Sequence, residues 1–154
     1  MRVLVQRSKE ASCVVDGKIT GKINNGLVLL IGFTAGDNID SINCLVKKII
    51  NLRIFDDENG VMNKSILDTN SDGILSISQF TLYADTSKGN RPSYIKALNG
   101  EEALKLYELF NKELEKYVKV ATGIFGADMK INLINDGPVT ILLERWFNGK
   151  QTKL

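Results

Sequence analysis

Residues 26–33 read Gly-Leu-Val-Leu-Leu-Ile-Gly-Phe, a continuous apolar run with glycines near its ends. A run this short, bounded by glycine and rich in aliphatic side chains, is typical of a β-strand that is buried on both faces. Such a strand needs cover on each side. We therefore expect it to lie centrally in a sheet, with the rest of the chain arranged around it.

Further strands are expected on either side of this run. Val3 and Val5 alternate with polar residues, and the strand continues to Val15 before Asp16-Gly17. This dipeptide favours a tight hairpin because both positions tolerate positive φ. Later strands are predicted, from β-branched and aromatic content between glycine-containing turns, at residues 73–83, 118–125, 130–134 and 139–146.

Two helices are predicted from apolar residues at helical spacing. The first follows Asp37 as its cap and buries Ile39, Ile42, Leu45, Val46, Ile49 and Ile50. The second starts near Asn99, with Glu102 completing a capping box, and buries Ala103, Leu106, Tyr107, Phe110, Leu114 and Tyr117. The order of elements predicts an α+β fold in a single domain, residues 1–154, with a mostly antiparallel, barrel-like sheet and two main helices packed on it.

Composition excludes several classes of protein. The net charge of the 154 residues is +2, too small to indicate a nucleic-acid binder by bulk electrostatics. Lys88, Arg91 and Lys96 form a local basic cluster, as do Lys150 and Lys153, although solvated faces explain both more simply. Cys13 and Cys44 are expected to be buried free thiols, with no metal site. Without a signal peptide or a membrane-spanning run, we expect a cytoplasmic protein with no membrane association.

The chain contains no histidine. The usual general base for a serine or cysteine nucleophile is therefore missing, and so is the commonest neutral metal ligand. Gly-rich phosphate loops and regular βαβ alternation are also absent, which argues against nucleotide cofactors. Any chemistry must use main-chain groups, hydroxyls or the substrate itself, with no cofactor.

Two short segments carry the functional signal. Ser78-Gln79-Phe80-Thr81 ends the predicted strand 73–83, with Ser78 and Phe80 on one face. Asn135-Asp136-Gly137-Pro138-Val139-Thr140 forms a predicted turn that contains one of only two prolines. Each segment alone fits an ordinary strand end or turn.

Together the two segments indicate a family. They occur in register with Lys88-Gly89, Arg91-Pro92-Ser93 and Phe125-Gly126-Ala127-Asp128-Met129, and with further matches from Gln6-Arg7 through Arg53-Ile54-Phe55 and Met62-Asn63. Over nearly its whole length the chain resembles the D-aminoacyl-tRNA deacylase (D-tyrosyl-tRNA deacylase) family. The resemblance implies an enzyme that binds the 3′-terminal adenosine of aminoacyl-tRNA, hydrolyses its ester bond and acts in proofreading during translation.

The resemblance also assigns roles to residues. It implies a homodimer with active sites at the subunit interface, each receiving the Gly137-cis-Pro138 turn of the partner. Ser78, Gln79, Phe80 and Thr81 match the catalytic wall opposite that turn, Phe125 and Met129 lie near the adenosine, and Arg7 helps to fix the turn. Main-chain oxygens would then reject an L-side chain, leaving D-aminoacyl groups, and achiral glycine on tRNA-Ala, as substrates.

Two chemical mechanisms remain open. In the one we favour, N–H donors stabilise the oxyanion while a ribose hydroxyl of the substrate helps to activate water. In the other, Thr81 is a covalent nucleophile, with Lys88 or Lys96 as its base.

Three rival functions are also considered. These are a related deacylase with a trans Gly-Pro bond that acts on small L-aminoacyl groups, a non-catalytic tRNA-binding module, and a small-molecule esterase. The esterase is disfavoured because neither a Gly-x-Ser-x-Gly elbow nor a histidine is present.

Overall fold

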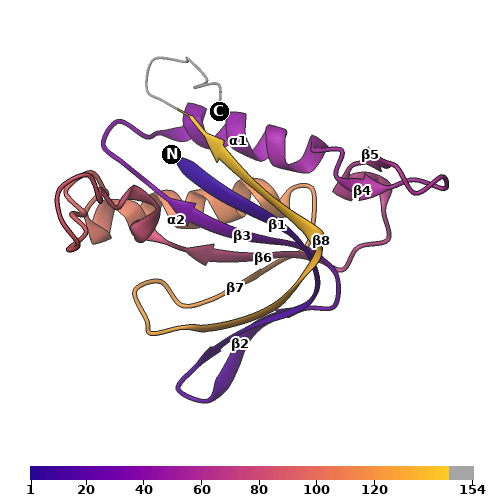
Figure 1. Ribbon diagram of the computed structural model, residues 1–154, viewed down its shortest axis with the longest axis horizontal. Helices are drawn as coiled ribbons and strands as arrows, with labels where there is room; N and C mark the ends of the chain where they lie inside the picture. The colour runs from indigo at the N-terminus through magenta and orange to yellow at the C-terminus, as the bar shows by residue number, and fades with distance from the viewer. Residues whose placement is uncertain (146–154) are drawn as a thin grey trace.

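The computed structural model describes residues 1–145, and its elements are shown in Figure 1. The strands are β1 (Arg2–Val15), β2 (Lys18–Ile23), β3 (Gly26–Gly32), β4 (Phe55–Asp56), β5 (Met62–Lys64), β6 (Gly73–Ser78), β7 (Val120–Thr122) and β8 (Lys130–Glu144). The helices are α1 (Ile39–Asn51) and α2 (Gly100–Glu115), with the short 3₁₀ helices η1 (Ile66–Asp68) and η2 (Phe80–Tyr83). The predicted α+β class is confirmed.

The main sheet runs in the order β2-β1-β3-β6-β7, and β8 pairs with β1. Strand β1 is antiparallel to β2, β3 and β8, whereas β3–β6 and β6–β7 are parallel pairs. The two ends of this order approach each other, since a β-carbon added at Gly21 of β2 would lie 2.5 Å from the Thr122 carbonyl oxygen of β7. The sheet is thus mostly antiparallel and nearly closed into a barrel, as predicted.

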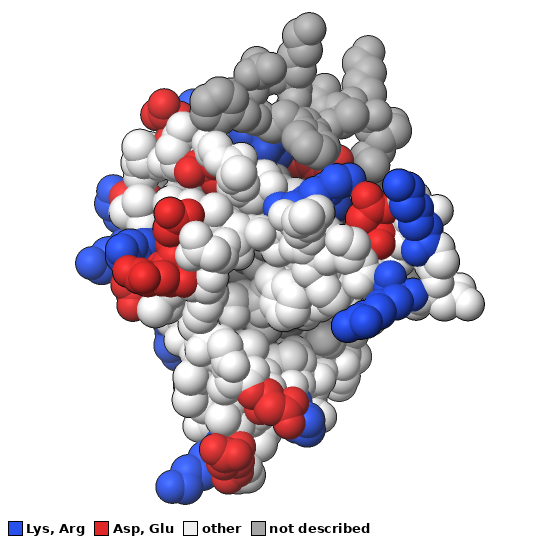
Figure 2. Space-filling model, turned by 90° about the vertical axis from the view of Figure 1, so that its left-hand side faces the viewer, with Lys and Arg blue, Asp and Glu red and all other residues white. Residues whose placement is uncertain are grey.

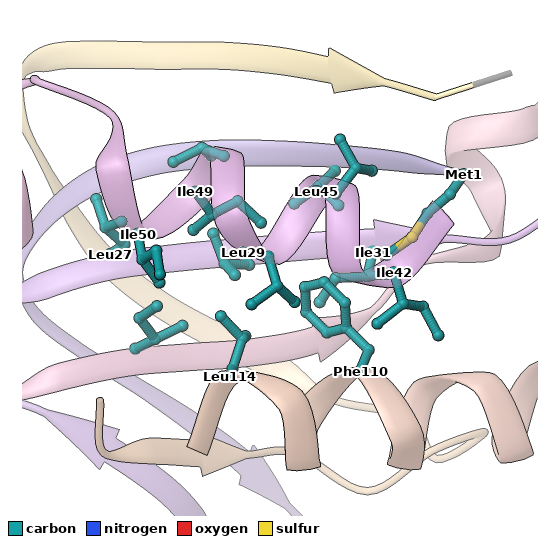
Figure 3. Packing of buried hydrophobic residues seen from close by; sticks show 14 of the residues in the cluster. Met1, Leu27, Leu29, Ile31, Ile42, Leu45, Ile49, Ile50, Phe110 and Leu114 are labelled. Atoms are coloured by element: carbon teal, nitrogen blue, oxygen red, sulfur yellow. The ribbon is translucent and has the colours of Figure 1, made fainter. Parts of the chain in front are cut away.

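Strand β3 lies between β1 and β6 and is buried on both faces. Leu27, Leu29 and Ile31 join the cluster formed with the two helices, which Figure 3 shows from close by. Val28, on the other face, packs with Cys13 and Leu75 inside the barrel. The alternation places one core on each side of β3, so its predicted central position is confirmed.

Helix α1 begins one residue later than predicted. Its cap is Asn38, whose Oδ1 accepts hydrogen bonds from the N–H groups of Asp40 (2.9 Å) and Ser41 (3.2 Å). The prediction of Asp37 as the cap is wrong because other donors occupy its carboxylate. The N-terminal ammonium group of Met1 lies 2.6 Å from Asp37 Oδ1, and Thr34 N–H donates to Oδ2 at 2.8 Å. This ion pair is almost fully buried.

Helix α2 is capped by Asn99 as predicted, since Asn99 Oδ1 accepts from Glu102 N–H at 3.1 Å. Its inward face buries Ala103, Tyr107, Phe110 and Leu114, while Leu106 is partly buried. Tyr117 was wrongly assigned to this face. The helix ends at Glu115, and Tyr117 is 53% exposed because the chain has already turned away.

The C-terminal part of the chain contains fewer strands than predicted. Residues 130–144 form one strand, β8, in place of two strands separated by a turn. The pairing of β8 with β1 shifts register, so that Gln6 faces Thr140 while Ser8 faces Asn135. The residues between Asn135 and Thr140 therefore bulge out of the ladder, which explains why their sequence is typical of a turn. The predictions for Trp146, Lys150 and Lys153 lie outside the described residues.

Cys13 is a buried free thiol and Cys44 a half-buried one. Within residues 1–145, neither helix combines the length and apolar character needed to cross a bilayer.

The pair between Met1 and Asp37 yields a stability prediction. Removing one partner of a buried ion pair leaves an uncompensated charge, so Asp37→Ala is expected to lower the free energy of unfolding by about 3 kcal/mol. Asn38→Ala removes only a helix cap and is expected to cost about 1 kcal/mol. Urea unfolding of the two variants measures both values. Equal midpoints for the wild type and Asp37→Ala would show that the pair contributes nothing.

Candidate functional site

A cavity of about 560 Å³ lies where β3 and β6 end, a volume typical of small-molecule sites. Four parts of the chain meet there: the end of β3, the segment after β6, the approach to α2, and the loop before β8. Figure 2 shows this end of the molecule, whose central area is largely uncharged and whose Lys, Arg, Asp and Glu side chains lie mostly around the rim. The cavity is accordingly lined by apolar side chains and main-chain groups, with few polar side chains. The lining includes Phe33, Ser78, Gln79, Phe80, Tyr94, Leu98, Ala103, Phe125, Asp128 and Met129.

The first wall is the segment that was predicted to continue a strand through Thr81. That prediction is wrong, because β6 stops at Ser78 and η2 begins at Phe80. Gln79 N–H still donates to the Ile31 carbonyl at 2.7 Å, but Leu82 N–H then closes a tight turn onto the Gln79 carbonyl. The turn places Phe80 at the mouth of the cavity, where it is 57% exposed. Its ring packs edge-to-face with that of Tyr94, with the two ring centroids 5.1 Å apart. Ser78 and Phe80 both line the cavity, although they do not share the strand face that was expected.

Thr81 is the predicted site residue of this segment that does not line the cavity. Its Oγ1 accepts a hydrogen bond from Gln79 Nε2 at 2.5 Å. In residues 1–145, the main-chain N–H groups of Phe80 and Thr81 donate to no protein group. The segment that forms the first wall therefore carries two main-chain N–H groups without a hydrogen-bond partner among the described residues.

The second wall is the loop that carries Phe125 and Met129, and it is tied to the first by a buried polar network. The Ser76 carbonyl, two residues before Ser78, accepts from Tyr107 Oη at 2.7 Å and from Gly123 N–H at 3.4 Å. The Tyr107 ring lies 5.8 Å from that of Phe125. Burial raises the pKa of Tyr107, so its hydroxyl keeps the proton that it donates. The network fixes the separation of the two walls.

Acid–base groups are scarce in the site. Asp128 is exposed, and both of its carboxylate oxygens lie 2.8 Å from Lys130 Nζ, so it is a paired surface carboxylate. In the part of the chain that the structure describes, no three His, Cys, Asp or Glu side chains are placed to hold a metal ion. The hydrogen-bond donors of the lining are main-chain N–H groups and the side chains of Ser78, Gln79 and Tyr94.

Gly137 and Pro138 lie elsewhere, at the bulge of β8. Both are exposed, and the peptide bond between them is cis. Arg7, which is buried, donates through Nε to the Asp136 carbonyl at 2.9 Å and through Nη1 to the Ile54 carbonyl at 2.8 Å. Asn135 Oδ1 accepts from Val139 N–H at 2.9 Å, which closes the bulge from the other side.

The two predicted halves of the site are not brought together within one chain. Arg7, beside the bulge, pairs with Leu27 of β3, whereas Ser78 pairs with Ile31. Four residues of strand separate these positions, or about 13 Å. Phe125, Met129 and Ser78 to Phe80 gather at the cavity, while Arg7, Gly137 and Pro138 lie toward the other end of β3.

Sequence reasoning missed part of the cavity. Tyr94, Leu98 and Ala103 line it, yet none was predicted as a site residue. Ala103 follows an ordinary helical pattern, and Leu98 is an isolated apolar residue before a cap. Only Tyr94 carried a signal, as an aromatic residue in a polar segment.

Comparisons with known proteins show the family of the chain. A family described as D-Tyr-tRNA(Tyr) deacylase matches residues 4–144. The chain belongs to this family. Deacylases of this kind hydrolyse the ester bond of aminoacyl-tRNA, so the predicted identity as an aminoacyl-tRNA deacylase is confirmed.

Two solved structures are similar to this deacylase, and they differ in sequence identity and TM-score. One is described as c-Myc DNA Unwinding Element Binding Protein and is 39% identical, with a TM-score of 0.88, over 94% of this chain and 99% of that chain. The other, a probable eukaryotic D-amino acid tRNA deacylase, is 17% identical, with a TM-score of 0.78, over 92% and 97% of the two chains. At 17% identity, the second comparison shows a shared fold alone.

The bulge of β8 yields a prediction about Gly137. Its φ is +134°, and an added β-carbon would lie 2.8 Å from Val139 Cγ2 and 3.1 Å from Arg7 Nη2. Gly137→Ala is therefore expected to lower the free energy of unfolding by about 1–3 kcal/mol. Gly100→Ala, with no atom within 4 Å of the added carbon, is the matched control and should not destabilise the protein. Thermal unfolding that is equal for both variants would contradict the geometry.

Proposed function

We propose that this deacylase hydrolyses D-aminoacyl-tRNA to a free D-amino acid and tRNA as a homodimer, with the Gly137–Pro138 bulge of each protomer reaching into the cavity of its partner. One observation carries the proposal. The bulge is exposed and lies about 13 Å along β3 from the wall it is expected to face. A second copy of the chain can bring the two together.

The cavity suits the end of an aminoacyl-tRNA. Phe125 and Met129 offer an apolar wall to the terminal adenosine, while Ser78, Gln79 and Phe80 form the wall for the aminoacyl group. The buried network at Ser76 holds these walls at a fixed distance. A substrate spanning both walls would have its ester bond between them.

Hydrolysis is proposed to rely on the substrate and the main chain. Water attacks the ester carbonyl, and the negative charge that develops on its oxygen is stabilised by the free main-chain N–H group of Phe80, which lines the cavity. The attacking water gives one proton to the ribose hydroxyl beside the ester, and that hydroxyl passes its own proton to the ribose oxygen that leaves as the ester C–O bond breaks. The second water proton is released when the acid product ionises to a carboxylate. An ester needs less activation than an amide, which fits a site without histidine.

The contacts of Thr81 give no support to a covalent mechanism. Its hydroxyl oxygen already accepts a hydrogen bond from Gln79. Lys96 Nζ is bound to Asp85 Oδ2 at 3.0 Å, and Lys88 makes no hydrogen bond within residues 1–145, so neither lysine is hydrogen-bonded to Thr81. These contacts favour the substrate-assisted mechanism.

Selection of the D-enantiomer is proposed to work by exclusion. Main-chain oxygens of the partner's bulge would occupy the space that an L-side chain needs, while a D-side chain would project into open space. The contact involves no particular side chain of the substrate. Different D-aminoacyl groups are then all accepted, and so is glycine, including glycine mischarged on tRNA-Ala.

The alternative of a non-catalytic nucleic-acid-binding module finds some support in one similar structure, whose description refers to binding a DNA element. A deacylation assay on charged tRNA separates the two functions. An alternative specificity for small L-aminoacyl groups is separated by the same assay with L-alanyl-tRNA.

The exclusion mechanism predicts a stereochemical difference. D-tyrosyl-tRNA should be deacylated roughly a hundredfold or more faster than L-tyrosyl-tRNA, because steric overlap costs about 3 kcal/mol. Glycyl-tRNA should be hydrolysed as well. Single-turnover release of labelled amino acid measures all three rates, and equal rates for the two tyrosyl enantiomers would contradict the proposal.

The substrate-assisted mechanism predicts that Thr81→Ala retains a kcat within about tenfold of the wild type, because no bond forms at Thr81. Loss of a true nucleophile would lower kcat about ten-thousandfold or more. The control is a D-tyrosyl-tRNA that lacks the free ribose hydroxyl beside the ester. We expect this substrate to be hydrolysed far more slowly than the natural one by wild type and variant alike.

A further inference from the structure

The segment from Asp85 to Ser93 is an ordered basic hairpin that the proposed chemistry does not use. Asp85 and Ser93 exchange two main-chain hydrogen bonds, of 2.8 and 2.9 Å. The Asp85 carboxylate accepts from Ser87 N–H at 3.0 Å and from Lys96 Nζ at 3.0 Å. The Ser87 hydrogen bonds and the nearby ammonium group hold the pKa of Asp85 well below its usual range, so the carboxylate that closes the hairpin stays charged.

The basic hairpin is docked at the mouth of the cavity. Tyr94, directly after it, lines the cavity and contacts the ring of Phe80. The following residues are tied to the end of β3, since Leu98 N–H donates to the Phe33 carbonyl at 3.0 Å and Thr34 Oγ1 donates to the Lys96 carbonyl at 2.6 Å. The position of the hairpin relative to the cavity is therefore fixed.

The basic hairpin and the residues that follow it carry an excess of positive charge. Residues 84–98 contain Lys88, Arg91 and Lys96 against Asp85 alone, an excess equal to the net charge of +2 of the whole chain. Lys96 is paired with Asp85. Lys88 and Arg91 are exposed and form no ion pair within residues 1–145. Two uncompensated cations therefore remain.

The hairpin that carries these cations is joined to one side of the cavity through Tyr94. Arg91 is three residues from Tyr94, so their Cα atoms are within about 11 Å of each other. On the opposite wall, Asp128 is neutralised by Lys130. An anionic chain that leaves the cavity meets favourable charge on the side of the basic hairpin.

We propose that Lys88 and Arg91 bind the phosphate groups of the nucleotides that precede the terminal adenosine of the substrate. This inference rests on the proposed function, because the adenosine must occupy the cavity for the preceding phosphates to lie at its mouth. Lysine and arginine contacts to phosphate release counterions, and they position the nucleic acid without reading its sequence. The hairpin thus supplies affinity for the polynucleotide, while the cavity supplies the chemistry.

The test compares two substrates of the wild type and of the double variant Lys88→Gln/Arg91→Gln. One substrate is D-tyrosyl-tRNA, and the other is the D-tyrosyl ester of adenosine, which contains no phosphate. For the tRNA we expect a KM raised about tenfold or more with an unchanged kcat. The slope of log KM against log salt concentration should fall by about 1.4, since each contact to single-stranded phosphate contributes about 0.7. For the adenosine ester neither constant should change.

A matched control removes the same charge elsewhere. Lys47 and Lys48 are exposed on α1, which contributes no residue to the cavity. Lys47→Gln/Lys48→Gln changes the net charge equally and is expected to leave the KM for tRNA and its salt slope unchanged. An equal rise in KM for both double variants would mean that overall charge, and not the hairpin, attracts tRNA, and would overturn the inference.

Two further outcomes would overturn the inference, and one would instead reject the proposed function. An unchanged KM for tRNA in Lys88→Gln/Arg91→Gln excludes phosphate contacts, and an equal loss on both substrates shows that the hairpin acts on the cavity itself. If the wild type hydrolyses neither substrate, the proposed function is rejected. In that case the affinity for uncharged tRNA, measured by fluorescence at several salt concentrations, still tests the hairpin. If the affinity of the double variant depends on salt as steeply as that of the wild type, phosphate contacts are excluded. A shallower dependence supports them.

Discussion

Strand β3 is hydrogen-bonded along both edges and buried on both faces, and this double constraint determines where each part of the site lies. Its pairing with β6 ends at Ile31 and Ser78, and the chain then turns into η2 at the cavity. Its pairing with β1 places Arg7 opposite Leu27, toward the other end of the strand. A shift of β3 by one residue would exchange its two cores and disconnect both functional segments from their supports.

The cavity and the glycine–proline bulge lie toward different ends of β3, and the proposed function depends on this separation. A cavity with a main-chain wall stands at one end of β3, and an exposed glycine–proline bulge held by Arg7 and Asn135 stands toward the other. In the proposed mechanism neither supplies a general base or a nucleophilic side chain. In the proposed dimer each protomer supplies a cavity and a bulge to two composite sites. A closed symmetric pair is the simplest assembly that satisfies both ends at once.

Local sequence predicted the parts of the fold that local energetics determine. The apolar run of β3, the Asp16-Gly17 hairpin with positive φ at both residues, and the Asn99 cap all follow from nearest-neighbour preferences. The errors arose where distant groups compete. The buried ammonium group of Met1 takes Asp37 from its expected role as a cap, and the turn after Gln79 is supported by Tyr94. Residues 135–140 look like a turn locally because the β1 ladder that they leave is more than a hundred residues away in the sequence. The cavity residues Leu98 and Ala103 had no local signal at all.

A crystal structure of the protein with a non-hydrolysable D-tyrosyl amide analogue of the 3′-terminal adenosine most directly tests whether two protomers form one composite site. We expect the adenosine to lie against Phe125 and Met129 and the aminoacyl group against Ser78 to Phe80. The main chain of Gly137 and Pro138 from a second protomer should face the chiral carbon. A complex in which one chain binds the analogue alone, with that bulge left in solvent and far from any second copy, would contradict this expectation.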